Sequence, residues 1–333
     1  MEDRLIFLIG SPRSGTTMLA RMLGAHSEIH APAEAHLMTG LAHLGYFEKV
    51  DEAPYDPIIT QLGLKELVAS LPHGEDDYVE ALRAHTDTLY EKLLAPSGKA
   101  RLLDKTPAYA LVLDFIARLY PGARYVVITR NPMAVWSSQV ESFFDGDPEE
   151  AQRKSPLLDR YVPAIARFLR ERPVPLIHVR YEELVADPER HAQEIAAHLG
   201  LPYEPAMVDY GEAAQGAAAR GLGDPVQAAK ASRPTTDSLD KWKAALAADT
   251  SKLDAARASL SRVLDADLET WGYRRADLAA ELDAISPRPG PSRKLDRFAL
   301  ERRVLGRLRK NIHHNALGRV VRRIRFICDV LLR

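Results

Sequence analysis

Residues 7–19 read FLIGSPRSGTTML. The apolar run at residues 5–9 predicts a short buried strand, and a Gly-Ser-Pro turn ends it. Residues 15–23 then carry apolar side chains at helical spacing, which predicts a helix. The chain therefore begins with a strand, a glycine-rich loop and a helix, in that order.

The loop of this unit has the chemistry of an anion-binding site. Successive backbone N–H groups and the N-terminus of the following helix point toward one place in such a loop, so they attract a phosphate or a sulfate. Arginine adds a fixed positive charge, and hydroxyl groups add further donors. We expect the anion to contact five consecutive residues: Arg13, Ser14, Gly15, Thr16 and Thr17.

A Walker A loop has a similar glycine spacing, but it places lysine after its second glycine, where this sequence has Thr16. In nucleoside triphosphatases that lysine reaches the β- and γ-phosphates, and the next hydroxyl binds magnesium. The substitution therefore speaks against hydrolysis of ATP or GTP. A P-loop kinase that phosphorylates a small molecule stays open as an alternative.

Two further strand–loop–helix units follow. A β-branched run predicts a strand at residues 124–129, and a helix begins near Met133. Residues 175–179 predict another strand, and an amphipathic helix follows it and ends at Gly200. Strands that alternate with helices predict an α/β fold, with a P-loop-like central parallel sheet flanked by helices. Ligands of such sheets bind beyond the carboxyl ends of the strands.

Two of these segments resemble the sulfotransferase family. FLIGSPRSGTTML resembles the family's loop for the 5'-phosphosulfate group, and VVITRNPMAVWSS, residues 126–138, resembles its 3'-phosphate motif. In that motif an arginine at the strand end and a serine eight residues later hold the 3'-phosphate; here they are Arg130 and Ser138. A strand-end arginine and a serine about two helical turns further on can converge on one phosphate. The resemblance implies 3'-phosphoadenylyl sulfate as the sulfuryl donor.

The resemblance extends over roughly residues 4–275. VRYEELVADPERHAQEIAAHLGLP, residues 179–202, is similar to a family segment whose tyrosine, here Tyr181, lies beside the nucleotide. The stretch that ends in SLDKW, residues 238–242, resembles the loop that closes over the nucleotide. That second likeness implies Lys241 as a further nucleotide contact.

Catalytic residues are implied by two other segments. HAPAEAHLMTG, residues 30–40, carries a Glu-x-His pattern similar to that of the glycan and Golgi-type sulfotransferases, whose glutamate acts as base. The resemblance implies Glu34 as the general base and His36 as a residue that orients it or binds the acceptor. In LLDKTPAY, residues 102–109, Lys105 resembles the family lysine that stabilises the leaving group.

The sequence departs from the cytosolic members of the family, which carry a catalytic histidine shortly after this lysine. Here residues 106–108 are Thr-Pro-Ala, which strengthens the assignment of Glu34. Asp104 is a weaker alternative base. Three aromatic side chains could line an acceptor pocket, although aromatics at helical spacing more often belong to a core: Trp136, Phe143 and Phe144.

Composition limits the remaining possibilities. The 333 residues are 46% hydrophobic and 27% charged, as in ordinary globular proteins. The single cysteine, Cys328, excludes an internal disulfide. No cluster of cysteine and histidine has metal-ligand spacing, so we expect sulfuryl transfer without a metal. No stretch resembles a targeting segment or a membrane span, which favours the cytoplasm.

Charge divides the chain at a linker rich in proline, residues 286–292. Residues 287–333 hold fourteen Lys or Arg and three Asp or Glu, a net charge of +11, so residues 1–286 carry −12 of the total of −1. Apolar residues recur near helical spacing in this tail, which predicts a basic amphipathic helix or helix pair. This tail could lie on the surface of an anionic membrane, or it could bind an acidic carrier protein, the acidic domain of the same chain or a second copy of the chain. Nucleic acid is not expected, because no recognition motif accompanies the charge.

These features predict a bacterial sulfotransferase domain, residues 1–286, and a C-terminal basic helical extension, residues 287–333. The expected reaction moves a sulfuryl group from 3'-phosphoadenylyl sulfate to a hydroxyl of a sugar, phenol, lipid or secondary metabolite. It is an in-line displacement with Glu34 as base. The alternatives are the small-molecule kinase and a catalytically silent sulfotransferase-like protein that binds membranes or partners through its tail.

Overall fold

The computed structural model describes residues 1–42, 57–211 and 232–287, so the predicted basic tail lies outside the described residues. Within them, a five-stranded sheet has the order β2-β3-β1-β4-β5. All neighbouring strands pair in parallel. The strands are β1 (Leu5–Gly10), β2 (Ile29–His30), β3 (Arg101–Asp104), β4 (Arg124–Thr129) and β5 (Leu176–Arg180).

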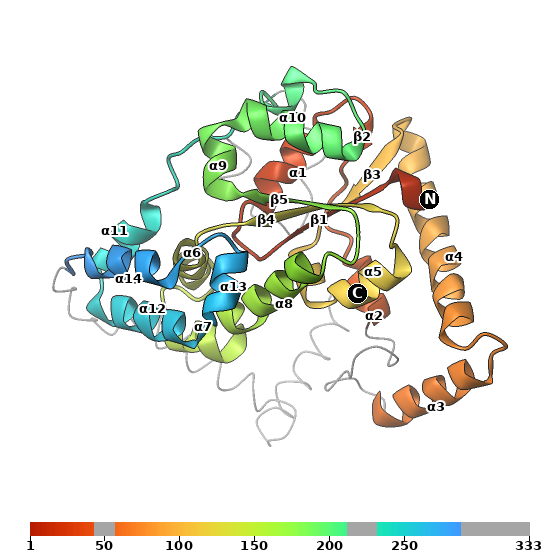
Figure 1. Cartoon of the computed structure of the whole chain (residues 1–333), viewed down its shortest axis with the longest axis horizontal. Coiled ribbons are helices and arrows are strands. Elements are labelled where there is room, and N and C mark those ends of the chain that lie inside the picture. Colours follow the sequence, from red (N-terminus) through yellow and green to blue (C-terminus); the bar gives the residue numbers. More distant parts are fainter. Residues whose placement is uncertain (43–56, 212–231, 288–333) are drawn as a thin grey trace, which may run out of the picture. The chain divides into compact units, whose positions relative to one another are not determined.

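Helices connect the strands and cover both faces of the sheet, as Figure 1 shows. The α-helices are α1 (Thr16–Gly24), α2 (Leu37–Ala42), α3 (Pro57–Ser70), α4 (Glu75–Leu94), α5 (Leu113–Leu119), α6 (Pro132–Phe143), α7 (Pro148–Lys154), α8 (Leu157–Glu171), α9 (Tyr181–Ala186), α10 (Pro188–Leu199), α11 (Lys241–Ala247), α12 (Thr250–Arg262), α13 (Asp265–Thr270) and α14 (Arg275–Asp283). Short 3-10 helices are η1 (Glu2–Arg4), η2 (Ala95–Ser97), η3 (Pro107–Leu111) and η4 (Pro205–Met207).

Strand β1 lies at the centre of the sheet and divides the core into two layers. Leu5, Phe7 and Ile9 pack into a cluster with residues of α4, α5, α6 and α8. The alternate side chains, Ile6 and Leu8, pack into a second cluster with residues of α1, α9 and α10. Burial of each such side chain contributes about 1.5–3 kcal/mol, so an apolar run buried on both faces determines the position of this strand.

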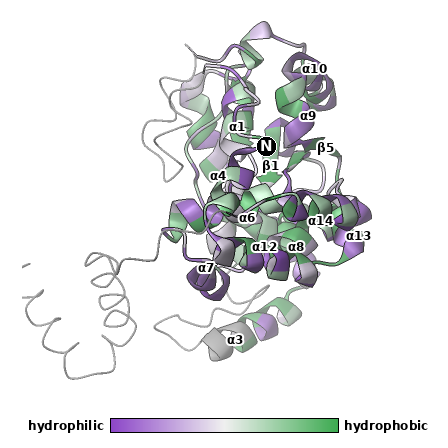
Figure 2. Cartoon of the chain, turned by 90° about the vertical axis from the view of Figure 1, so that its left-hand side faces the viewer, coloured by the Kyte–Doolittle hydropathy of each residue, from purple (hydrophilic) through white to green (hydrophobic). Residues whose placement is uncertain are grey.

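Hydropathy follows the same layers. Figure 2 shows hydrophobic residues on the strands and on the helices beside them, and mainly hydrophilic residues on α7, whose sequence is PEEAQRK. None of the helices in the described part of the chain is both long and apolar enough to cross a bilayer.

Several helices begin with an Asn-Pro or Asp-Pro pair. Asn131 precedes α6, and its side chain accepts hydrogen bonds from the backbone N–H groups of Met133 and Ala134. Asp147 and Asp187 cap α7 and α10 in the same way, each followed by proline at the first helical position. Such caps stabilise a helix start by about 1 kcal/mol, and proline there loses no hydrogen bond. Asn131 and Pro132 therefore determine that α6 begins directly after β4.

The predicted α/β fold is confirmed. The strand expected at residues 124–129 matches β4, and those expected at residues 5–9 and 175–179 match β1 and β5 within one residue at each end. The helix expected at residues 15–23 runs from Thr16 to Gly24. Strands β2 and β3 were not expected from the sequence as strands.

Candidate active site

Every strand of the sheet ends next to a residue predicted to act in the site. The anion loop follows β1, Glu34 lies four residues after β2, and Lys105 follows β3 directly. Arg130 follows β4, and Tyr181 follows β5. Because all the strands are parallel, these residues lie at the same edge of the sheet, where α/β proteins bind their ligands.

The anion loop approaches its neighbours very closely. Gly15 caps α1 with a φ of 95°, and a Cβ atom there would lie 2.5 Å from Cδ2 of Tyr181. At Gly10 a Cβ atom would lie 2.7 Å from Oγ of Ser14. Arg13 also has a positive φ, 68°. Glycine is therefore required at both ends of the loop, and the backbone between them is free to turn its N–H groups toward an anion.

Arg130 is held by contacts from three segments. Its guanidinium lies over the Tyr181 ring, 4.3 Å from the centroid. Its Nη1 donates to the carbonyl oxygen of Arg13 at 3.2 Å, and its Nη2 donates to that of Ser238 at 2.8 Å. The hydroxyls of Tyr181 and Ser238 are hydrogen-bonded at 2.6 Å. The predicted residues Arg130 and Tyr181 thus lie together.

Arg13 and Ser138 join the anion loop to α6. Nε of Arg13 donates to Oγ of Ser138 at 3.0 Å. The same guanidinium lies 5.8 Å from the centroid of the Phe143 ring. The anion loop and the segment at residues 126–138 therefore meet through this hydrogen bond and through the bond from Arg130 to the carbonyl of Arg13. We call Arg13, Arg130, Ser138, Tyr181 and Ser238 the arginine cluster.

Two buried polar atoms in this region have no hydrogen-bond partner among the described residues: Oγ of Ser11 and Nε of Arg130. Ser11 belongs to the anion loop, and Arg130 belongs to the arginine cluster. Leaving such an atom unpaired costs about 1–3 kcal/mol. These two polar atoms lie beside a cationic cluster, so the oxygens of a polyanionic ligand would suit them as hydrogen-bond partners.

The turn that carries Arg130 is held by residues of β5 and α9. The N–H of Asn131 donates to Oε1 of Glu182 at 2.9 Å, and the Tyr273 hydroxyl donates to the other oxygen of the same carboxylate. Thr129, one residue before Arg130, is hydrogen-bonded to Nε2 of His178 at 2.8 Å. Burial and the nearby Arg180 charge lower the pKa of His178 to about 4. The backbone under the arginine cluster is therefore rigidly positioned.

A second group of residues follows β2 and β3. Nζ of Lys105 donates to Oε1 of Glu34, and their side chains are only 9% and 12% exposed. Nε2 of His36 lies 3.7 Å from Oε2 of Glu34, and its ring is 43% exposed. We call Glu34, His36 and Lys105 the carboxylate–lysine centre. A shielded ion pair adds little to stability, because desolvation offsets the attraction.

Asp104 lies beneath this centre. Its Oδ2 accepts hydrogen bonds from the hydroxyls of Tyr90, at 2.6 Å, and Tyr109, at 2.9 Å. The side chain is fully enclosed, and burial raises its pKa although both tyrosines oppose that shift. A carboxyl bonded to two buried hydroxyls has a supporting position, which leaves Glu34 as the accessible carboxylate near Lys105.

The remaining predicted residues lie as follows. Ser14 donates its hydroxyl to the carbonyl of Ser11 at 2.7 Å, and Thr16 and Thr17 form the first two positions of α1. Lys241 is exposed at the first position of α11. Of the three aromatic residues, Trp136 is buried in the core, Phe144 packs against it, and Phe143 is 62% exposed.

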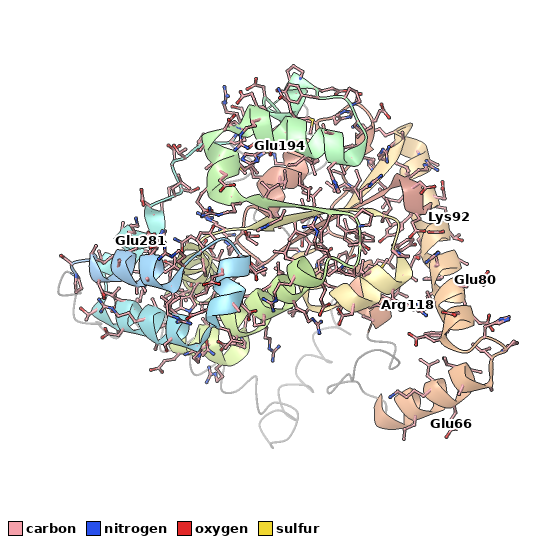
Figure 3. The ribbon with its side chains drawn as sticks, in the orientation of Figure 1. Glu66, Glu80, Lys92, Arg118, Glu194 and Glu281 are labelled. Atoms are coloured by element: carbon pink, nitrogen blue, oxygen red, sulfur yellow. The ribbon has the colours of Figure 1, made fainter. Side chains whose placement is uncertain are left out.

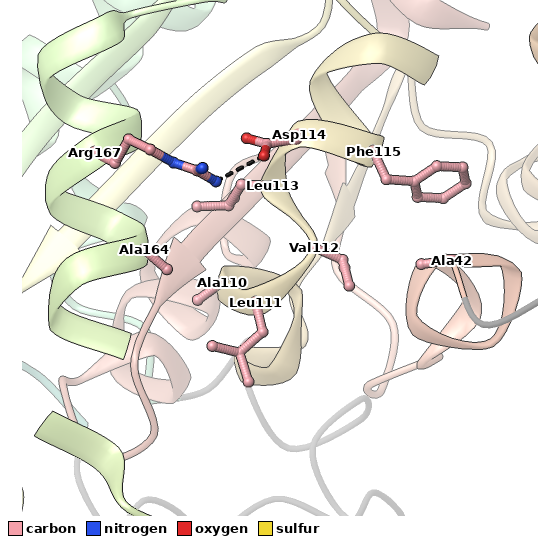
Figure 4. Close-up of a pocket in the computed structure, with 9 residues that line it drawn as sticks. All are labelled: Ala42, Ala110, Leu111, Val112, Leu113, Asp114, Phe115, Ala164 and Arg167. Atoms are coloured by element: carbon pink, nitrogen blue, oxygen red, sulfur yellow. Dashed lines mark hydrogen bonds and ion pairs between the residues drawn. The ribbon is translucent and has the colours of Figure 1, made fainter. Parts of the chain in front are cut away.

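A hollow beside η3 is lined by the end of α2, by residues 110–115 and by α8. Its lining is Ala42, Ala110, Leu111, Val112, Leu113, Asp114, Phe115, Ala164 and Arg167, and Figure 4 shows the ion pair of Asp114 and Arg167 across it. That ion pair measures 2.6 Å. Seven of its nine lining residues are apolar, and Asp114 and Arg167 form its charged pair.

Comparison with known proteins identifies the family. A model described as "Sulfotransferase family" matches residues 5–205 of this chain. This match includes the anion loop, the carboxylate–lysine centre and all five strands. The chain belongs to the sulfotransferase family.

Two curated relatives are similar to this sulfotransferase. Nodulation protein NoeE of Sinorhizobium fredii (strain NBRC 101917 / NGR234) is 34% identical over 228 residues, which cover 61% of this chain and 51% of that protein. Protein-tyrosine sulfotransferase A of Caenorhabditis elegans is 24% identical over 206 residues, which cover 60% of this chain and 50% of that protein. The chain spans about half the length of each of these relatives.

Among solved structures, the sulfotransferase domain from the curacin biosynthetic pathway is similar at 23% sequence identity, with a TM-score of 0.48. The match covers 77% of this chain and 96% of that domain.

One residue of the arginine cluster, Ser238, was not predicted from the sequence. Ser238 contacts both Arg130 and Tyr181, whereas the same segment had suggested Lys241. The resemblance of SLDKW, residues 238–242, indicated the correct segment. Nothing in the sequence distinguishes its serine as the residue that contacts Arg130. The described residues hold no group of three or more His, Cys, Asp or Glu side chains arranged to bind a metal ion.

Proposed function

We propose that this sulfotransferase takes its sulfuryl group from 3'-phosphoadenylyl sulfate and transfers it to a hydroxyl of a small acceptor. The observation that carries the proposal is the arrangement of the five strand ends, which brings an anion loop, an arginine cluster and a shielded carboxylate–lysine pair to one edge of the sheet. These are the parts that in-line transfer between anionic groups requires.

The arginine cluster and the anion loop would hold the nucleotide. The N–H groups of residues 13–17 and the N-terminus of α1 suit the 5' end. Arg130 and Ser138 suit the 3'-phosphate, because a guanidinium and a hydroxyl then meet one phosphate. The unpaired Nε of Arg130 supports this role, since a bound phosphate would supply its acceptor.

The carboxylate–lysine centre would carry out the transfer. When bound, 3'-phosphoadenylyl sulfate supplies an activated sulfuryl group on a phosphate leaving group. Glu34 accepts the proton of the acceptor hydroxyl as the new oxygen–sulfur bond forms. Lys105 offsets the negative charge on the phosphate oxygen whose bond to sulfur breaks. Nε2 of His36 lies 3.7 Å from Oε2 of Glu34, close enough to orient that oxygen.

The acceptor is proposed only by class: a sugar, a phenol, a lipid or a secondary metabolite with a free hydroxyl. The reaction needs no metal, because the loop and the basic side chains supply the positive charge. We also propose a cytoplasmic location, with the basic tail at residues 287–333 contacting an anionic membrane, a carrier protein or a second copy.

The two alternatives have less support. A small-molecule kinase would need the phosphate-binding lysine of a Walker A loop. In this chain Thr16 occupies that position and is buried at the start of α1. A catalytically silent binding protein would not need the shielded pair of Glu34 and Lys105.

Calorimetric titration with 3'-phosphoadenosine 5'-phosphate, without magnesium and alongside ATP and GTP, tests the proposed donor. We expect selective binding of the 3'-phosphorylated nucleotide. Tight, magnesium-dependent binding of ATP with no binding of the 3'-phosphorylated nucleotide would instead make the chain a kinase.

A further inference from the structure

A buried polar cluster lies between the two segments that form the carboxylate–lysine centre. Glu34 and His36 belong to the loop between β2 and α2, whereas Lys105 belongs to the turn between β3 and η3. Side chains from the second segment reach the backbone of this loop and of α2, which follows the loop directly. The hydroxyl of Tyr109 accepts a hydrogen bond from the N–H of Met38 at 3.2 Å. The hydroxyl of Thr106 is the acceptor for the N–H of His36 at 3.4 Å.

These acceptors are rigid because they are enclosed and linked. Thr106 and Tyr109 are both 0% exposed. Tyr109 donates its own proton to Asp104 at 2.9 Å, and the backbone N–H of Tyr109 donates to the carbonyl oxygen of Thr106 at 3.0 Å. Tyr90, from α4, donates to the same oxygen of Asp104. A fully bonded buried network of this kind holds a unique geometry.

The loop that the cluster holds has a strained backbone. His36 has a φ of 53°, in the left-handed region that residues with a side chain rarely adopt. Such a conformation costs about 1 kcal/mol or more and persists only where surrounding contacts impose it. The bonds to the N–H groups of His36 and Met38 lie at and just after the strained residue.

We infer that Tyr109 is a positioning residue for the transfer reaction: with Thr106 and Asp104, it fixes the Glu34 loop against the segment that carries Lys105. Tyr90 bonds the same carboxylate but no atom of the Glu34 loop. Tyr109 therefore acts through the position of Glu34, and Tyr90 does not. This inference rests on the proposed role of Glu34 as base.

The pair of variants Tyr109→Phe and Tyr90→Phe tests the inference. Each removes one buried hydroxyl from Asp104 and keeps the ring, and Tyr109→Phe also leaves the N–H of Met38 without its acceptor, so both should lose thermal stability and Tyr109→Phe somewhat more. Hydrogen–deuterium exchange of the peptide spanning residues 31–41 should become at least about tenfold faster in Tyr109→Phe and stay close to the wild-type rate in Tyr90→Phe. The kcat of Tyr109→Phe should fall about tenfold to hundredfold, with unchanged affinity for 3'-phosphoadenosine 5'-phosphate.

Equal exchange or equal kcat in the two variants would overturn the inference. If the wild-type protein transfers no sulfuryl group, the proposed function fails, yet the exchange comparison still decides whether Tyr109 holds the loop. Thr106→Val and Thr106→Ser form a second pair in case Tyr109→Phe does not fold. The valine variant should accelerate exchange at residues 31–41, and the serine variant, which keeps the acceptor oxygen, should not.

Discussion

The arginine cluster and the carboxylate–lysine centre are built in different ways. The arginine cluster follows β1, β4 and β5, and its members bond directly to one another, Arg13 to Ser138 and Tyr181 to Ser238 through side chains and Arg130 to the backbone carbonyl of Ser238. The carboxylate–lysine centre follows β2, at the edge of the sheet, and β3, which have two and four residues. Its position depends on buried polar contacts beneath it. The residues that we propose for nucleotide binding and those that we propose for sulfuryl transfer are therefore supported by separate structural elements.

If this separation holds, a change in the centre should affect turnover alone. Lys105→Met removes the cation that offsets leaving-group charge, so kcat should fall about 100- to 1,000-fold. Affinity for 3'-phosphoadenosine 5'-phosphate should change only slightly. The measurement is a sulfuryl-transfer assay with the best acceptor from a panel, together with a nucleotide titration.

The control for that variant is Lys92→Met. Lys92 is exposed on α4, as Figure 3 shows, and its removal should change neither quantity. A Lys105→Met enzyme with wild-type kcat would contradict the assigned role of the lysine.

A change in the arginine cluster should affect binding first. Arg130→Ala removes a guanidinium that we place on the 3'-phosphate, so affinity for 3'-phosphoadenosine 5'-phosphate should fall by about 2–3 kcal/mol, roughly 30- to 150-fold. Arg124 lies at the opposite end of the same strand and is exposed, so Arg124→Ala is its matched control. Calorimetry that finds the same Kd for both variants would remove Arg130 from the binding site.

The two regions also differ in how well the sequence predicted them. Strands β1 and β4 have six residues each, long enough for an apolar pattern to predict them, and their loops were located from local signals. No such pattern predicted β2 and β3, and Glu34 and Lys105 were assigned only through family resemblance. The contact of Ser238 with Arg130 spans 108 residues, and the contact of Tyr109 with Met38 spans 71. Local periodicity carries no information on such tertiary contacts.

Acid should destabilise the support of the arginine cluster. Burial lowers the pKa of His178 to about 4, below the ordinary value of 6.5. The neutral ring therefore contributes its full stabilisation above pH 6.5, and this contribution is lost as the pH falls from 6.5 toward 4. We expect a loss of roughly 2 kcal/mol over that range, since the ring is partly exposed.

Thermal unfolding at pH 7.5 and at pH 4.5 measures this loss. His178→Gln can keep a hydrogen bond to Thr129 but cannot titrate, so its melting temperature should fall less between the two pH values than that of the wild type. An equal fall in both proteins would assign the acid sensitivity to other groups.

The smallest effect concerns the strained loop of the carboxylate–lysine centre. His36→Ala keeps a side chain at a φ of 53°, whereas His36→Gly relieves the strain. The glycine variant should therefore be more stable by about 0.5–1 kcal/mol, and both variants should lose the imidazole near Glu34. Chemical denaturation of the pair measures the difference, and a more stable alanine variant would contradict the strain.

The central claim, that Glu34 is the base of a sulfuryl transfer from a separately bound nucleotide, is tested most directly by Glu34→Gln. Glutamine keeps the size of the side chain and removes the proton acceptor, while Glu28→Gln changes a carboxylate before the other end of β2 and serves as control. Nucleotide titration and sulfuryl transfer are measured on the same preparations. We predict that Glu34→Gln binds 3'-phosphoadenosine 5'-phosphate as tightly as the wild type and loses at least about 1,000-fold in kcat. Wild-type turnover in Glu34→Gln would contradict the account.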